Sequence, residues 1–306
     1  MKNSFPNEVA TVRVNGIEIA HQSFGDKEAS PLFLIMGLGS QMVLWDDDFC
    51  RQLAAGGYRV IRFDNRDIGL STRFDGLPVP DLTAVAAALQ RGQTPALPYT
   101  LADMAADTVE LIAALGYDRV HVVGESMGGM IGQIMAVTFP ERLLTLTSIM
   151  SSTGSPLLPP PKPEALAILA APFPTDRDGY IKSFVRAYGV LSGPALPIDR
   201  TRAQKWAEQS YERGINPAGT ARQFAALMAA GDRTKALATV SVPTLVIHGD
   251  ADPLLPVDCG RATAAAIPGS RLKIIAGMGH ALPETVWAEV IAEITRHARR
   301  KSIAFG

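Results

Sequence analysis

Apolar positions along the chain form one alternating segment followed by several uninterrupted runs. Residues 9–24 alternate apolar and polar side chains on both sides of Asn15-Gly16, a dipeptide typical of a tight β-hairpin turn. Uninterrupted runs are typical of strands buried on both faces of a sheet, and they occupy residues 31–36, 58–63, 119–124, 144–150, 243–249 and 271–276. The pattern therefore predicts an eight-stranded sheet whose first hairpin forms an antiparallel edge.

Helical periodicity fills long stretches between these runs. In residues 100–116 the apolar positions recur at helical spacing, with Thr100 placed as an N-cap and Gly116 as a stop signal. Residues 283–300 begin with Pro283 and carry a second apolar stripe. Because strands alternate with helices, the sequence predicts an α/β fold with a mostly parallel sheet and helices on both faces.

The alternation stops between Thr153 and Ala238. A proline-rich break at residues 154–163 is followed by helix-like segments with no buried strand, at residues 164–171, 178–191, 199–214 and 217–231. We expect residues 153–238 to form a helical cap domain over one end of the sheet. Residues 1–152 and 239–306 would then form the core domain.

Composition and charge argue against several classes of protein. With 306 residues, 47% hydrophobic and 19% charged, the chain can bury a large core. A net charge of −1 gives no electrostatic reason to bind nucleic acid or an anionic membrane. Cys50 and Cys259 have neither metal-ligand nor disulfide-framework spacing. No signal peptide or membrane span is recognised, so we expect a cytoplasmic protein with no metal and no cofactor.

The segment "GESMGG" carries the strongest chemical signal. Gly124, Ser126 and Gly128 match G-x-S-x-G directly after a predicted strand and at the start of a helical pattern. Such a sharp turn exposes the serine hydroxyl at the carboxyl edge of the sheet, and small neighbours are needed where side chains would collide. The alternative interpretation is a serine N-cap in an ordinary turn.

A serine hydroxyl becomes a useful nucleophile only when a base takes its proton. Of the five histidines, His280 lies in a glycine-flanked loop after the last predicted strand, at the same sheet edge as Ser126. His248 is a weaker candidate, and the others are interpreted as structural residues: His21, His121 and His297. The supporting acid is expected after the preceding strand, where spacing alone leaves Asp250 and Asp252 open.

These motifs resemble the α/β-hydrolase fold superfamily over nearly the whole chain. In that family the acid sits in a G-x-x-D-x-x-x-P turn, and Gly249, Asp252 and Pro256 fit this register, so the resemblance selects Asp252. Residues 63–71 resemble the family's D-x-R-G-x-G-x-S loop. There Arg66 and Asp67 follow Asp64. Arg66 is expected to brace loops near the turn at Ser126, and Asp67 stands where glycine is usual.

The family's His-Gly-x-Gly turn is altered here. Met36 replaces the histidine, whereas Gly37 and Gly39 remain. The turn serves to aim a backbone N–H at a developing oxyanion, so the resemblance implies that the amides of Leu38 and Met127 are the two donors. The Met-Gly variant is similar to a subgroup that includes aclacinomycin methylesterase, a hydrolase of carboxylic methyl esters.

The resemblance implies a serine carboxylesterase that hydrolyses an uncharged, partly apolar small-molecule ester through an acyl-enzyme. Alternatives are a carbon–carbon bond hydrolase, a lactonase or a cofactor-free perhydrolase with the same triad, or a receptor without turnover. Glu125 argues mildly against the carbon–carbon group, which tends to carry asparagine before the nucleophile. Candidate pocket residues, each also explained by core packing, are Met42, Trp45, Met127, Phe173, Phe184, Tyr188, Trp206 and Met278. The role of Glu125 and the oligomeric state stay open.

Overall fold

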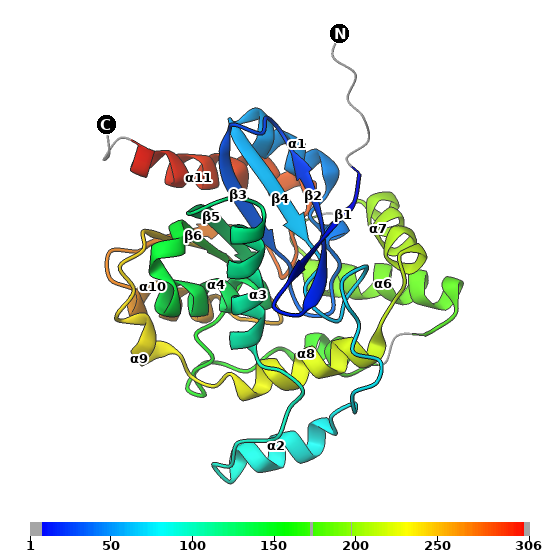
Figure 1. Cartoon of the computed structure of the whole chain (residues 1–306). Helices are drawn as coiled ribbons and strands as arrows, with labels where there is room; N and C mark the ends of the chain where they lie inside the picture. Colours follow the sequence, from blue (N-terminus) through cyan, green and yellow to red (C-terminus); the bar gives the residue numbers. More distant parts are fainter. Residues whose placement is uncertain (1–7, 172–173, 197, 303–306) are drawn as a thin grey trace.

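The computed structural model describes residues 8–171, 174–196 and 198–302. Its centre is an eight-stranded sheet with the order β1-β2-β4-β3-β5-β6-β7-β8 (Figure 1). The strands are β1 (Ala10–Val14), β2 (Ile17–Phe24), β3 (Ser30–Ile35), β4 (Tyr58–Phe63), β5 (Val120–Glu125), β6 (Leu143–Ile149), β7 (Thr244–Gly249) and β8 (Arg271–Ile275). The β1–β2 and β2–β4 pairs are antiparallel, and the other five pairs are parallel. The predicted fold class is thereby confirmed.

The opening hairpin turns where the sequence predicts it. Asn15 and Gly16 have φ values of 48° and 80°, and Val14 pairs with Ile17 across the turn. Two successive residues in the left-handed region are what a two-residue hairpin turn with the twist of its strands requires. Asparagine and glycine adopt that region at low cost.

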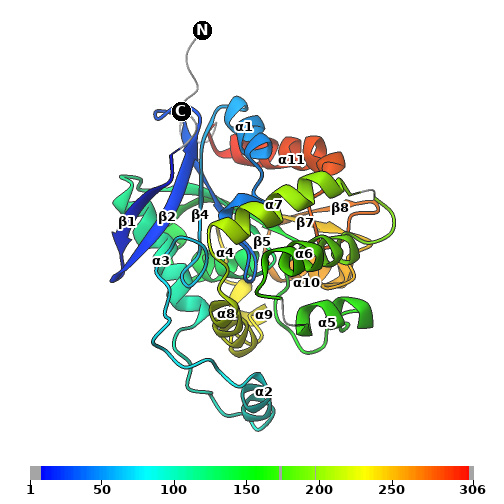
Figure 2. The same ribbon diagram turned by 90° about the vertical axis from the view of Figure 1, so that its right-hand side faces the viewer.

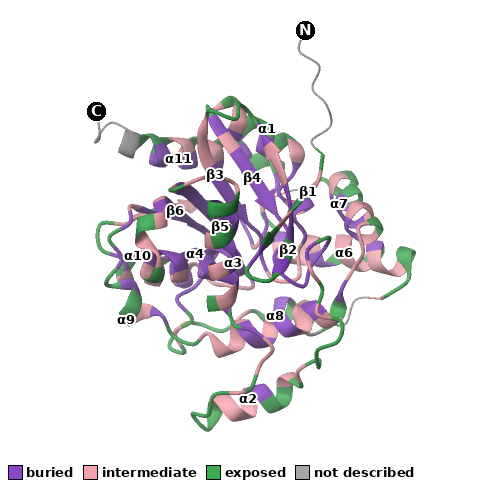
Figure 3. Cartoon of the chain, viewed as in Figure 1, coloured by how far each residue is buried: buried purple, intermediate pink, exposed green. Residues whose placement is uncertain are grey.

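Alternation along the central strands divides the core between the two faces of the sheet. On β3, Phe33 and Ile35 belong to a cluster with helices α3 (Leu101–Ala114), α4 (Met127–Thr138) and the end of α10 (Val257–Ala266). Leu32 and Leu34 belong to a second cluster with helices α1 (Asp47–Ala55) and α11 (Glu284–Ser302). Side chains that alternate along a strand point to opposite faces, and Figure 3 shows the central strands buried between the helices. Helices therefore cover both faces, as predicted.

The edge strand β8 differs from the sequence expectation. Its run was expected to be buried on both faces, but Leu272 is 39% exposed and Ile275 is the only one of its five residues that is fully buried. β8 pairs with β7 alone among the described strands, since it ends the sheet. An apolar run therefore does not distinguish a central strand from an edge strand.

Between β6 and β7 the chain forms the helical insertion that the sequence predicts. It contains α5 (Pro163–Ala170), α6 (Arg177–Ser192), α7 (Arg200–Glu212) and α8 (Pro217–Ala229), which gather on one side of the sheet (Figure 2). The short helix α9 (Thr234–Leu237) leads back to the core. We call the segment from α5 to α8 the cap; its limits at residues 153 and 238 stay a prediction.

Helix α2 (Leu82–Gln90) was not predicted. It lies away from the sheet and packs against the cap helix α8 (Figure 1). Asp81 caps it by accepting hydrogen bonds from the amides of Thr83 and Ala84. That aspartate, ahead of an alanine-rich stretch, was the available signal. Of the helices that the structure describes, none is both long and apolar enough to cross a lipid bilayer.

Candidate active site

The turn between β5 and α4 holds Ser126 in a strained backbone conformation. Its φ is 53° and its ψ −117°, a region that residues with a Cβ rarely adopt. The Ser126 amide donates to the carbonyl of Ile149 over 2.9 Å, and Ser151 Oγ donates to the Ser126 carbonyl over 2.8 Å. Strain of this kind persists only where the surroundings impose it, and here the end of β6 supplies that support.

Both glycines of the motif are required by close backbone contacts. A Cβ at Gly124 would lie 2.2 Å from the carbonyl oxygen of Gly128. A Cβ at Gly128 would lie 2.2 Å from the carbonyl oxygen of Ile35, at the end of β3. The helix can therefore approach the sheet edge closely enough to present Ser126 only because these side chains are absent.

Three side chains from separate strand ends meet at this edge of the sheet. His280 Nε2 lies 3.0 Å from Ser126 Oγ, and His280 Nδ1 lies 2.8 Å from Asp252 Oδ2. Asp252 follows β7 and His280 follows β8, so the parallel strands bring them to the carboxyl edge. The Asp252 side chain has no exposed surface, and that of His280 is 7% exposed. This arrangement can carry a proton from the serine oxygen to the imidazole.

The loop after β7 shows why the two candidate aspartates differ. Asp250 Oδ1 accepts a hydrogen bond from the Gly277 amide over 2.6 Å and so closes the loop after β8. Asp252 Oδ1 accepts from the amides of Leu254 and Leu255, each over 2.8 Å, which leaves Oδ2 for His280. The structure therefore brings Asp252, and not Asp250, to the imidazole.

His248 lies beside the acid rather than beside the serine. Its fully buried ring has Nε2 2.7 Å from the carbonyl of Leu255 and 3.4 Å from Asp252 Oδ2. Gly260 leaves room for the ring, since a Cβ there would lie 2.6 Å from His248 Nδ1. In the sequence, His248 is only a weaker candidate for the general base. The structure places it where it supports the loop that carries Asp252.

Electrostatic interactions among the side chains at this site favour an ionised Asp252 carboxylate and a basic His280 imidazole. Burial alone would raise the pKa of Asp252, but the adjacent His280 and the hydrogen bonds from His248 and His280 outweigh it and hold that pKa well below its usual range. Burial alone would lower the pKa of His280, yet Asp252, and then Glu125, raise it above 6.5. The imidazolium formed during proton transfer is thus stabilised from two sides.

Glu125, directly before Ser126, faces the site without a hydrogen-bond partner among the described residues. Its side chain is half-buried, and burial raises its pKa to about 7, against the opposing effect of His280. Its charge also raises the pKa of Tyr188 on α6, after the larger effect of burial there. Glu125 is therefore close enough to influence both the His280 imidazole and the cap helix α6 electrostatically.

The turn that follows β3 runs alongside Ser126. A Cβ at Gly37 would lie 3.3 Å from Ser126 Cβ and 3.8 Å from Ser126 Oγ. The amide of the next residue, Leu38, donates no hydrogen bond within the described part of the chain. The Met127 amide opens α4, where helix amides have no intrahelical acceptor. The residues predicted to supply the two donors are thus next to Gly37 and to Ser126 in the chain, and their role stays a prediction.

Met36, which replaces the family's histidine, is a core residue. Its side chain is 1% exposed and joins the cluster that contains Trp45 and Trp287. Its carbonyl accepts a hydrogen bond from Asn65 Nδ2 over 3.0 Å. The replacement therefore removes a ring from the turn without removing a backbone donor.

The loop after β4 is held by two buried ion pairs, one to helix α3 and one to the cap helix α8. Arg66 Nε and Nη2 contact the Asp107 carboxylate of α3 at 2.5 and 2.7 Å, and the Asn15 side chain donates to the same carboxylate. Arg66 thus ties this loop to helix α3, and a bracing role for it near Ser126 stays a prediction. Asp67 has a φ of 72°, the left-handed conformation that glycine usually supplies, and it binds Arg222 on α8.

Most predicted pocket residues are instead packed in the core. The exposed fractions are 0% for Met42 and Met278, 0% for Met127, 1% for Trp45 and 4% for Trp206. These residues belong to the hydrophobic core, so a pocket role for their side chains stays a prediction. Sequence alone could not separate them from pocket residues because large apolar side chains suit both places.

Two predicted pocket residues remain accessible. Phe184 and Tyr188 are half-buried on α6, with ring centroids 6.5 Å apart and nearly parallel planes. Tyr188 also contacts the buried Trp206 edge to face, at 5.4 Å between centroids. Phe173 lies outside the described residues. An aromatic face on the cap therefore adjoins the region of Glu125 and His280.

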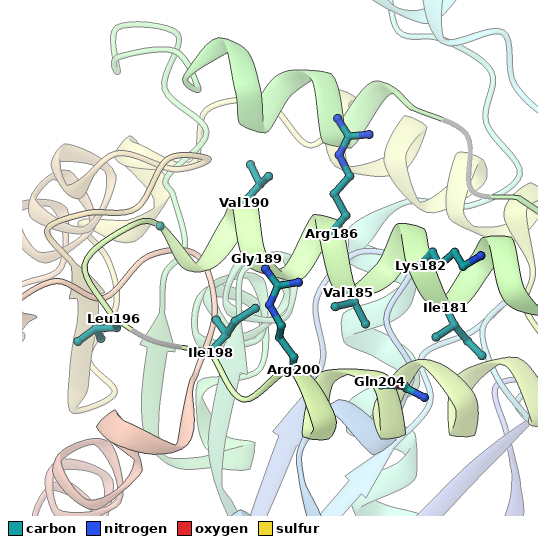
Figure 4. Close-up of a pocket in the computed structure, with 11 residues that line it drawn as sticks. Ile181, Lys182, Val185, Arg186, Gly189, Val190, Leu196, Ile198, Arg200 and Gln204 are labelled. Carbon is teal, nitrogen blue, oxygen red and sulfur yellow. The ribbon is translucent and has the colours of Figure 1, made fainter.

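A separate groove of about 570 Å³ lies on the cap (Figure 4). It is lined by α6, the start of α7 and the segment between them, including Val185, Arg186, Leu196 and Arg200. None of the predicted catalytic or oxyanion residues lines it. Its position on the cap helices separates it from the Ser126 hydroxyl, so we assign it no part in the chemistry.

The fold and the site geometry place Ser126 on a sharp turn from β5 into α4, which we call the elbow and which is typical of hydrolases. A comparison with protein families agrees with this class. The model of the alpha/beta hydrolase fold family matches residues 30–285, so the chain belongs to that family.

Individual relatives extend the comparison. Rhodomycin D methylesterase DauP of Streptomyces sp. (strain C5) is 31% identical over 92% of this chain and 95% of its own length. Rhodomycin D methylesterase DnrP of Streptomyces peucetius matches with the same identity and the same coverage. The structure of a meta-cleavage product hydrolase from Pseudomonas fluorescens IP01 matches with a TM-score of 0.73 and 16% identity, covering 95% of this chain and 97% of that one. That last likeness shows the shared fold alone.

Proposed function

We propose that this chain is a serine carboxylesterase with Ser126 as nucleophile, His280 as general base and Asp252 as supporting acid. The observation that carries the proposal is the continuous contact from Ser126 Oγ through the imidazole to Asp252, at 3.0 and 2.8 Å. Similarity to two methylesterases supports an ester as substrate. A receptor without turnover would not need a strained serine held against a base.

Proton movements follow from the geometry. His280 Nε2 takes the proton of Ser126, and the serine oxygen attacks the ester carbonyl carbon to form a tetrahedral oxyanion. The amides of Leu38 and Met127 donate to that oxyanion, and Asp252 stabilises the imidazolium. His280 then gives its proton to the departing alcohol as the C–O bond breaks, which leaves an acyl-enzyme.

Hydrolysis of the acyl-enzyme repeats these steps with water. His280 takes a proton from a water molecule, whose oxygen attacks the acyl carbon. The second tetrahedral oxyanion contacts the same two amides. Collapse returns the proton to Ser126 and releases the carboxylic acid, so the enzyme is restored with one ester and one water consumed.

The substrate class is proposed from the surroundings of the site. An ester bound between the sheet edge and the cap would meet the aromatic face of Phe184 and Tyr188, which favours an uncharged, partly apolar molecule. Glu125 disfavours a substrate that places a negative charge beside the elbow, because like charges repel. In this proposal residues 153–238 act as the cap domain that closes over the ester.

A panel of p-nitrophenyl and methyl esters that varies acyl and alcohol size independently tests the proposal, with Ser126→Ala as the blank. Turnover of some members, absent in the variant, is expected. Lactones and vinylogous 1,5-diketones in the same panel distinguish a lactonase or a carbon–carbon bond hydrolase with the same triad. Equal release of product by both proteins would overturn the assignment of Ser126.

A further inference from the structure

Helix α8 of the cap contacts the turn that carries the Leu38 amide. Gln223 Oε1 accepts a hydrogen bond from the Gly39 amide over 2.9 Å, and Gln223 Nε2 donates to the Arg66 carbonyl over 2.9 Å. The Gln223 side chain is fully buried. One cap residue therefore joins the turn after β3 to the loop after β4.

The approach of α8 to this turn is close at a second point. A Cβ at Gly39 would lie 2.8 Å from both Cγ2 and Oγ1 of Thr220, which is one helical turn before Gln223. Residues three apart share a helix face. Gly39 also has a φ of +66°, so both its conformation and its contact with α8 call for glycine.

The bond to Gly39 holds the N–H side of a peptide group whose carbonyl, that of Leu38, accepts a hydrogen bond from Ser40 Oγ over 3.4 Å. Residues 37–40 form a β-turn in which the Ser40 amide donates to the Gly37 carbonyl over 3.3 Å. Common β-turn types differ by a rotation of the central peptide group, which here joins Leu38 to Gly39. The hydrogen bond from the Gly39 N–H to Gln223 selects one orientation of this peptide group. It thereby fixes the backbone angles on both sides of the group.

We propose that Gln223 is a positioning residue that holds the turn so that the Leu38 amide is aimed at the oxyanion. The inference rests on the proposed esterase function and adds to it: the cap completes the oxyanion site as well as covering it. The Gln223 side chain hydrogen-bonds to Gly39 and Arg66 and not to Ser126, so it acts through the turn. Its loss should weaken transition-state binding more than substrate binding.

The test compares Gln223→Met with Asn216→Ser in the full chain. Methionine has a similar length but neither accepts from Gly39 nor donates to Arg66. Asn216 also ties α8 to the core, through hydrogen bonds from Nδ2 to the Asp67 carbonyl and carboxylate at 2.9 and 3.0 Å, but it does not touch the turn. Serine at 216 keeps the N-cap oxygen, so this variant controls for loosening of the helix.

For Gln223→Met we expect kcat on an ester to fall about 10- to 100-fold, less than the ~10²–10³-fold loss of a whole oxyanion donor. KM should change little, and affinity for a trifluoromethyl ketone that forms a tetrahedral adduct should fall in step with kcat/KM. Asn216→Ser should keep kcat within about threefold of the wild-type value, because no oxyanion donor moves. Equal losses in the two variants, or an unchanged kcat in Gln223→Met, would overturn the proposal.

Amide hydrogen exchange gives a second readout that needs no turnover. In Gln223→Met the Gly39 amide loses its acceptor and should exchange faster than in the wild-type protein and in Asn216→Ser. Unchanged exchange would contradict the contact itself. A wild-type protein that hydrolyses no ester would instead refute the proposed function, so the two failures are distinguishable.

Discussion

Asp67, in the loop after β4, and Arg222, on the cap helix α8, form a buried two-point ion pair. Arg222 Nε lies 2.6 Å from Asp67 Oδ2 and Nη2 lies 2.9 Å from Oδ1, with 1% or less of either side chain exposed. Tyr99 and Asn216 donate to the same carboxylate at 2.9 and 3.0 Å. These contacts compensate for a positive φ that glycine would adopt without strain.

The pair should show strong coupling in a double-mutant cycle. Asp67→Gly relieves the backbone strain but leaves the Arg222 guanidinium buried without its carboxylate, and breaking such a pair costs about 3–5 kcal/mol. Asp67→Gly combined with Arg222→Met removes both charges and should recover most of that loss. Urea unfolding of the four proteins measures the coupling. Additive losses would show that the two residues act independently.

Backbone contacts at the elbow predict that two glycines of α4 differ strongly in how well they tolerate replacement by alanine. Gly128→Ala places a Cβ 2.2 Å from the Ile35 carbonyl, which belongs to the sheet backbone and cannot move away cheaply. Overpacking of this kind costs about 1–3 kcal/mol or more, and displacement of Ser126 should abolish ester turnover. The control is Gly132→Ala, whose Cβ would meet the end of the Leu146 side chain at 2.7 Å.

For Gly132→Ala we expect activity close to wild type, because a flexible side chain can shift and alanine favours the helix by about 1 kcal/mol. Thermal unfolding and ester turnover check both variants. A fully active, stable Gly128→Ala protein would contradict the elbow geometry.

The acid limb of the kcat/KM profile should report on His280. The imidazole must be neutral to accept the serine proton, and its pKa lies above 6.5 because Asp252 outweighs the effect of burial. Activity should therefore fall as the pH drops through that raised pKa. In Asp252→Asn the pKa falls, so the limb should move to lower pH while kcat drops by about 10⁴-fold. Stopped-flow turnover across pH measures both effects, and a limb that moves to higher pH would contradict them.

Glu125 should affect the pH profile more than the rate. Its carboxylate stabilises the His280 imidazolium, so replacing it by the neutral amide in Glu125→Gln should lower the imidazole pKa and move the acid limb to lower pH. The plateau at high pH should change little. Asp250→Asn is the control, since Asp250 binds the Gly277 amide instead. An unshifted limb in Glu125→Gln would remove Glu125 from the electrostatics of the site.

Local sequence patterns predicted the parts of the molecule that depend on near neighbours. The hairpin at Asn15-Gly16, the N-cap of α3 at Thr100 and the turn at Ser126 each follow from a few adjacent residues. The acid was ambiguous from spacing, because Asp250 and Asp252 lie two residues apart in one loop and differ in the partners that folding gives them. The family register resolved a choice that physical reasoning on the sequence could not.

Contacts between distant segments could not be predicted in this way. Asp67 and Arg222 are 155 residues apart, and Gly39 and Gln223 are 184 apart, so no local pattern links them. The departure from glycine at Asp67 was visible, but its partner was not. Pocket residues are hard to predict for a related reason: the apolar character of Met42 and Trp45 does not tell whether a helix or a ligand covers them.

The central claim is that Ser126 is an activated nucleophile, and covalent labelling tests it most directly. Treatment with an organophosphonate, followed by intact-mass and peptide analysis, should show one adduct located on Ser126, formed in step with the loss of ester turnover. Ser126→Ala should acquire no adduct and show no turnover. Labelling at another residue, or retained turnover in Ser126→Ala, would contradict the account.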